Sequence, residues 1–169
     1  MLAYRLVRLI ENHSERLAET LSERLKSCDK CAAFHTVPAQ EFRQRVYEVY
    51  EHLGEWLLGK KEDEIARRYQ EIGARRAAQG VPLSQLIYAL VLVREHLWEY
   101  LKHEAGVEKP VEIFGELEML QLLEQFFDRA SYYAAVGYEK ALLDSNRGAT
   151  TRQGRGADTA EEIGHVVGH

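Results

Sequence analysis

Apolar residues recur every three or four positions along most of this chain, which is the spacing of helices that bury one face. No stretch of any length alternates with the period of two that a half-buried strand requires. The pattern therefore predicts an all-α fold, a bundle of about five helices with short connections. These helices are expected at about Leu2–Leu25, Ala39–Leu58, Glu62–Gln79, Pro82–His103 and Pro110–Asp144.

Prolines and glycines agree with these boundaries. Pro38, Pro82 and Pro110 stand at helix starts, where a missing N–H leaves no helical hydrogen bond unmade. Gly59 and Gly80 follow helix ends, where glycine adopts the backbone that terminates a helix. The connection that ends in Pro38, SCDKCAAFHTVP, has no helical period and is predicted to be a loop.

The last helix is the longest, and two glycines interrupt it. Gly115 and Gly137 either bend this helix or allow another helix to approach closely. The segment that follows is rich in Gly, Thr and Ala and has no large apolar residue before Ile163. We therefore expect a helical domain over residues 1–144 and a flexible tail over 145–169.

Composition limits the partners that the chain can have. Its 169 residues suit one domain, and 46% of them are hydrophobic, which is enough to bury a core. The net charge of -5 disfavours nucleic acid, because phosphates require a basic face. The basic residues Arg67, Arg68, Arg75 and Arg76 are interleaved with acidic ones, so we expect them to form a solvated helix face with charge pairs. No stretch reaches the roughly 18 apolar residues of a membrane span, and the N-terminus lacks a secretory signal. We expect a cytoplasmic protein that binds neither nucleic acid nor membrane.

The sharpest local motif is a pair of cysteines followed by a histidine in the predicted loop. Cys28, Cys31 and His35 offer three of the four ligands that a zinc site needs, and His13 or His52 could supply the fourth. A covalent haem site is excluded because alanine follows the second cysteine. Three interpretations stay open: two ordinary thiols, a metal site, or a reversible disulfide.

No catalytic constellation stands out in the sequence. It has no nucleophile elbow, no P-loop and no dinucleotide-binding fingerprint, so we predict that it is not an enzyme. The only Glu-x-x-His pair of the kind found in di-iron bundles is Glu162–His165, in the predicted tail. His96 lies close to the apolar face of its helix, either as a core histidine satisfied by a hydrogen bond or as a haem ligand in a globin-like pocket.

Two stretches carry a resemblance to a known family, Arg67–Leu101 and Phe126–Leu142. In the first, a helix ends in G-x-R-R, Q-G-V-P-L-S follows, and the next helix carries a hydrophobic run and H-L-W. This arrangement resembles the N-terminal helical domain of RsbT co-antagonist proteins of the RsbRD type. The similarity extends over most of the helical body.

The resemblance implies a sensory or regulatory input domain in bacterial stress-response signalling. In that family the helical domain precedes a STAS domain, which joins a stressosome and controls a switch kinase. The residues after the helices here are too few for a STAS domain, so we expect signalling through a separate protein or through self-association, for example as a homodimer. The alternative is a metal- or redox-responsive sensor that uses Cys28, Cys31 and His35.

Overall fold

The computed structural model describes residues 2–59, 62–104 and 110–161, and in these ranges regular structure is helical throughout. The predicted all-α class is therefore confirmed. The elements are α1 (Leu2–Lys26), the short 3-10 helix η1 (Asp29–Phe34), α2 (Ala39–Leu57), α3 (Glu62–Ala78), α4 (Leu83–Glu104) and α5 (Pro110–Glu161).

Two features differ from the boundaries that the pattern predicted. The segment between the first two long helices contains η1 instead of an irregular loop. The last helix continues to Glu161, well beyond the predicted end at Asp144. A solvent-exposed helix needs no apolar stripe, so hydrophobic periodicity does not reveal where it ends.

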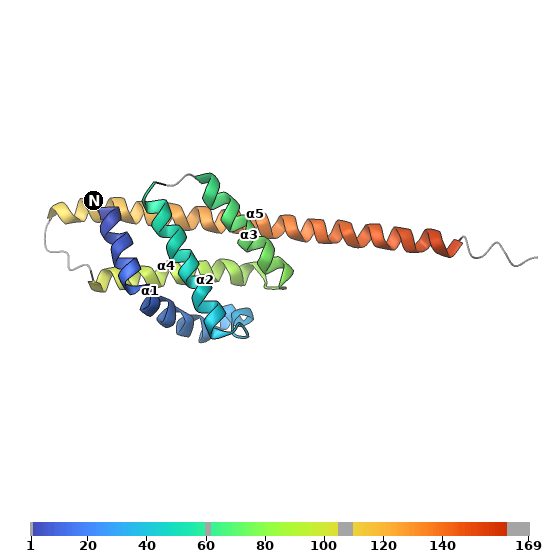
Figure 1. Ribbon diagram of the computed structural model, residues 1–169, viewed down its shortest axis with the longest axis horizontal. Helices are drawn as coiled ribbons and strands as arrows, with labels where there is room; N and C mark the ends of the chain where they lie inside the picture. The colour runs from blue at the N-terminus through green and yellow to red at the C-terminus, as the bar shows by residue number, and fades with distance from the viewer. Residues whose placement is uncertain (1, 60–61, 105–109, 162–169) are drawn as a thin grey trace, which may run out of the picture.

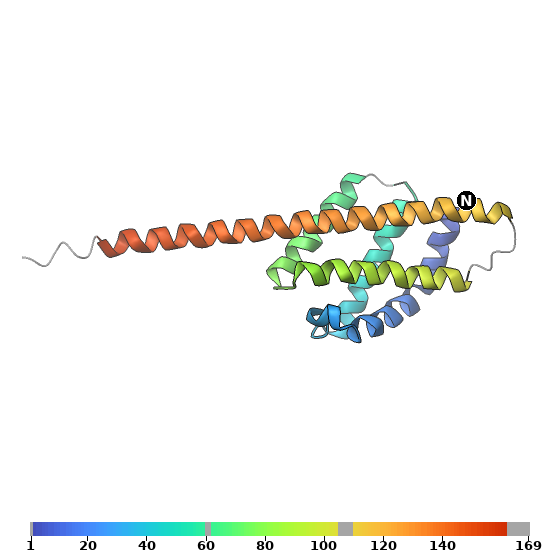
Figure 2. The ribbon, with the colours of Figure 1, turned by 180° about the vertical axis from the view of Figure 1, so that it is seen from behind.

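Helix α5 runs along the length of the bundle and extends beyond it (Figure 1). It contacts α1, α2, α3 and α4. Helix α4 runs antiparallel beside it, while α3 crosses it, and α1 packs mainly against α2 (Figures 1 and 2). The buried side of α5 is therefore in contact with the whole bundle.

The core is built from the apolar faces that the sequence pattern shows. An aromatic group lies at its centre, where the rings of Tyr69 and Phe126 meet edge to face at 5.8 Å and Phe126 meets Phe127 in the same way at 5.2 Å. Edge-to-face contacts add to the stabilisation from burial. The largest fully buried side chains are Leu17, Leu21, Leu25, Cys31, Tyr50, Leu53, Ile65, Tyr69, Leu97, Leu123 and Phe126.

Glycines set the close approach of α3 and α5. A Cβ atom added at Gly73 would overlap the carbonyl oxygen of Ala134, and one added at Gly137 would overlap that of Gln70. The two backbones are therefore in direct contact at this crossing. The predicted close helix contact at Gly137 is confirmed. Glycine makes it possible, because a Cβ atom at this position would overlap the backbone of α3.

The C-terminal part of α5 leaves the bundle and projects as a single helix (Figure 1). Most side chains described after Tyr138 are exposed, including Leu142 and Leu143. A single helix without tertiary contacts is only marginally stable in water. The flexible tail that we predicted is consistent with this geometry over residues 145–161, and residues 162–169 lie outside the described ranges.

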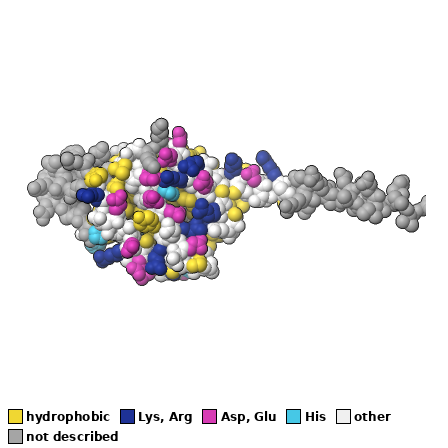
Figure 3. All heavy atoms as spheres, viewed as in Figure 1, with side chains coloured by type: hydrophobic (Ala, Val, Ile, Leu, Met, Phe, Trp, Pro, Cys, Tyr) yellow, Lys and Arg dark blue, Asp and Glu magenta, His cyan; other side chains and the backbone are white. Residues whose placement is uncertain are grey.

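The outer surface mixes both signs of charge. Figure 3 shows Lys and Arg side chains interleaved with Asp and Glu over the bundle. Arg24 of α1 pairs with Glu95 and Glu99 of α4, and Arg94 pairs with Glu124 of α5. Within the described ranges, the helices lack an apolar stretch long enough to cross a bilayer.

Candidate functional site

The turn between α3 and α4 is tied to α5. Gly80 adopts a φ of 70°, a left-handed conformation that ends α3 without strain. The next residue, Val81, is buried, and its carbonyl oxygen accepts a hydrogen bond of 2.7 Å from the hydroxyl of Tyr138. This hydrogen bond connects the turn to α5 at the point where α5 leaves the bundle.

Arg76, in the last turn of α3, is buried with only 6% of its surface exposed. Its Nη1 atom donates to Oε1 of Gln79 at 2.6 Å, and its guanidinium lies over the ring of Phe34, 5.6 Å from the ring centre. Burial lowers the pKa of Arg76 to about 10, with Arg45 and Arg75 acting in the same direction.

The burial of Arg76 corrects our sequence interpretation of the basic segment. We took Arg67, Arg68, Arg75 and Arg76 together as a solvated helix face, and Arg67 and Arg75 are indeed exposed. A signal for Arg76 was available, since it follows Ile65 and Tyr69 at helical spacing on the buried face of α3. Its charge outweighed that spacing in the sequence argument.

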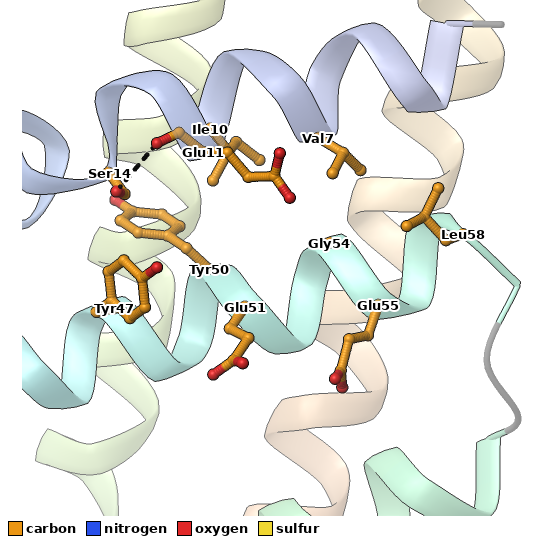
Figure 4. A pocket seen from close by; sticks show the side chains of 10 residues that line it. All are labelled: Val7, Ile10, Glu11, Ser14, Tyr47, Tyr50, Glu51, Gly54, Glu55 and Leu58. Carbon is orange, nitrogen blue, oxygen red and sulfur yellow. Dashed lines mark hydrogen bonds between the residues drawn. The ribbon is translucent and has the colours of Figure 1, made fainter.

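A groove lies between α1 and α2 (Figure 4). It has a volume of about 270 Å³. The side chains of Val7, Ile10 and Leu58 supply apolar surface, and Glu11 reaches into the space between the helices (Figure 4). Tyr50 also lines the groove, and its buried hydroxyl finds no hydrogen-bond partner in the part of the chain that the structure describes. The groove offers apolar contact with acidic side chains at its edge.

The cysteine motif folds into η1 and places its two thiols differently. Cys31 is completely buried, whereas Cys28 is half-buried, and both are free thiols. The pKa of Cys31 is raised to about 12, mainly by burial and also by the neighbouring Cys28 thiol. The ring of His35 turns to the backbone, where its Nε2 lies 3.0 Å from the carbonyl oxygen of Cys28.

The zinc site on Cys28, Cys31 and His35 stays a prediction. In the part of the chain that the structure describes, no group of three His, Cys, Asp or Glu residues is placed to hold a metal ion. The two candidates for the fourth ligand face aromatic rings instead. The ring centres of His13 and Tyr100 are 5.6 Å apart, and those of His52 and Tyr69 are 5.7 Å apart. Metal binding would require His35 to turn and Cys31 to leave the core.

His96 is half-buried and links α4 to α1 through a side-chain hydrogen bond. Its Nε2 lies 2.8 Å from Oγ1 of Thr20. Burial lowers the pKa of His96, and the positive charge of Arg24 lowers it further. The structure therefore favours the hydrogen-bonded histidine over the haem ligand. The pair Glu162–His165 lies outside the described residues.

The fold is a helical bundle that holds one long helix, which continues beyond it. The model of the RsbT co-antagonist protein rsbRD N-terminal domain matches residues 6–153 of the chain. The chain belongs to this family, which the residues of the α3–α4 turn had indicated. Among curated proteins and among solved structures, none matches the chain.

Proposed function

We propose that the chain is a non-enzymatic sensory and regulatory input domain of bacterial stress-response signalling. The observation that carries this proposal is the family match over residues 6–153, which includes both the bundle and the first part of the projecting helix. The described sites support it, because they are sites for binding and contact: a groove, a buried arginine and a hydrogen-bonded histidine.

Helix α5 is the element best placed to carry a signal out of the bundle. Its inner part is packed against the other helices, and its backbone touches that of α3 at Gly73 and Gly137. A change in how the bundle packs must therefore shift α5, since close-packed interfaces do not deform freely. The projecting part of α5 then carries that shift to a partner.

The partner that we propose is a signalling protein or a second copy of this chain. Two large apolar side chains, Leu142 and Leu143, are 44% and 58% exposed where α5 leaves the bundle. Tyr132 is 64% exposed and lies eleven positions before Leu143, which is three helical turns along the same side. Exposed apolar residues along one side of a helix suit contact with another helix.

Sedimentation velocity tests this proposal with the whole chain, alone and mixed with purified STAS-domain co-antagonists and an RsbT-type switch kinase. We expect saturable association with at least one of them or with itself. The variant Leu142→Glu/Leu143→Glu should weaken it by about tenfold or more, because charges must then be buried. The matched control Glu139→Gln/Lys140→Gln, on the same exposed stretch, should retain it. A chain that associates with none of them contradicts the proposal.

The cysteine loop supports the alternative, a redox- or metal-responsive sensor. Its supporting observation is that the Cys28 thiol is close enough to Cys31 to help raise the pKa of the Cys31 thiol. Thiol titration before and after mild oxidation, together with zinc content, tests this function. Loss of two thiols without dimerisation, or one zinc per chain that Cys28→Ser/Cys31→Ser removes, would support it; unchanged thiols without zinc would exclude it.

A further inference from the structure

A second cavity, partly open to solvent, lies between α2, α3 and α4 and against η1. Its volume is about 70 Å³. Because a single water needs about 10–15 Å³ by this measure, the cavity has room for about five groups of that size. Its walls are mostly apolar, and they include Phe34, Phe42, Val46, Leu86, Leu90 and Val93.

Arg76 places a positive charge in this apolar wall. It lines the cavity. Within the described part of the chain, its guanidinium makes one hydrogen bond to a side chain, and the acceptor is the neutral amide of Gln79. Glu41, which attracts Arg76 from a distance, is already paired with Arg45. Glu48 also lines the cavity and attracts Arg76 less than Glu41 does. Since a guanidinium has five N–H donors, most of them remain for another acceptor.

Tyr69 adds a second unused donor to the same cavity. Its side chain lines the cavity and is fully buried, and among the described residues its hydroxyl has no hydrogen-bond partner. Tyr69 and Arg76 are seven positions apart on α3, so they lie two turns apart on the same face of the helix. A buried polar group without a partner is unfavourable, so the Tyr69 hydroxyl would gain from binding an acceptor. The remaining N–H groups of Arg76 can donate to the same acceptor.

We propose that this cavity binds a small carboxylate with a short aliphatic tail of about three or four carbons, with Arg76 and Tyr69 donating to the carboxylate and the apolar walls covering the tail. A carboxylate accepts the bidentate bonds that a guanidinium offers. Inorganic phosphate fits less well, because it has no apolar part for these walls. The inference deepens the proposed sensory function by naming a ligand class, and rests on that function for its meaning.

Calorimetric titration of the whole chain with butyrate at constant ionic strength tests the proposal. We expect saturable binding with one site per chain, and none for 1-butanol, which has the same tail without the charge. Arg76→Gln should abolish the binding, and Tyr69→Phe should weaken it by about tenfold, since it removes a bond to a charged group. The matched control Arg67→Gln, at an exposed arginine of α3 outside the cavity, should bind as the parent does.

Two results would overturn the proposal: no saturable heat with butyrate, or equal affinity in the parent and in Arg76→Gln. If Arg76→Gln does not fold, as judged by circular dichroism, Ala89→Leu replaces it. Ala89 lines the cavity and is partly buried, so this change fills space while keeping Arg76. Binding that survives in Ala89→Leu would also overturn the proposal. Butyrate binding without any effect on partner association would leave the site established and contradict only the sensory function.

Discussion

Burial decides the protonation of three side chains in this bundle. Cys31 stays a neutral thiol at neutral pH, because burial raises its pKa to about 12. Arg76 stays charged, because its pKa of about 10 still lies above neutral pH. The pKa of His96 is lowered from 6.5, first by burial and then by Arg24. Of these three residues, His96 is therefore the one that titrates in the mildly acidic range.

Mild acid should destabilise the fold through His96. Since its pKa is lower in the folded chain than in the unfolded chain, the folded state binds fewer protons over this range. Stability is therefore lost as the pH falls below about 6.5 towards the folded pKa. Burial lowers the pKa of His52 as well, so it acts in the same direction.

The measurement is the urea midpoint between about pH 7.5 and pH 5.5, the range in which histidine titrates. His96→Gln should show a shallower decrease than the parent, because one of the titrating groups is gone. His103→Gln, which replaces an exposed histidine, is the control and should follow the parent. Equal slopes in all three proteins would show that His96 does not contribute.

At the scale of elements, the crossing of α3 and α5 depends on small residues. Gly73 and Gly137 remove the side chains that would otherwise separate the two helices, and Ala130 and Ala134 are fully buried nearby on α5. Close approach brings backbone atoms of both helices into van der Waals contact, which is individually weak and collectively large. The crossing is therefore sensitive to the addition of a single methyl group.

Gly137→Ala should destabilise the fold by about 2–3 kcal/mol, because the new Cβ must displace the backbone of α3 at Gln70. Gly148→Ala is the matched control on the same helix, where an added Cβ meets no atom within 4 Å. It should change the stability by less than about 0.5 kcal/mol. Urea unfolding of both variants measures the difference, and similar midpoints would contradict the packing argument.

The sequence predicted the elements well where burial leaves a periodic trace. The five long helices begin within a few residues of their predicted starts, because apolar spacing and three prolines mark them. The end of α5 was missed because its exposed part has no such spacing. The position of Arg76 was missed for a different reason: its partners, Phe34 and the cavity wall, come from other elements and are known only from the tertiary fold.

At the scale of the whole molecule, a packed bundle and a single projecting helix are joined through α5 (Figure 2). The bundle contains the buried residues, the groove and the second cavity. The projecting part has exposed side chains over the range in which they are described. These two parts should therefore differ in what they contribute: the bundle supplies stability, and the projection supplies contact area.

A chain that ends after Ala141, and so lacks Leu142 and Leu143, should test this division. Its thermal midpoint should lie within about 2 °C of that of the full chain, because the removed residues contribute little burial. Its association with itself or with a signalling partner should weaken, because part of the contact area is gone. Calorimetry and sedimentation velocity measure the two effects. A large loss of thermal stability would show that the projecting residues are part of the folding unit.

The backbone contact at Gly137 also has a geometric consequence for the far end of α5. From Gly137 to Glu161 the helix rises by about 36 Å, at about 1.5 Å per residue. If α3 and α5 pivot about their crossing by about 5°, trigonometry moves the far end by about 3 Å, which is comparable to the length of a hydrogen bond. A displacement too small to disturb the core can thus make or break contacts at a surface far from it.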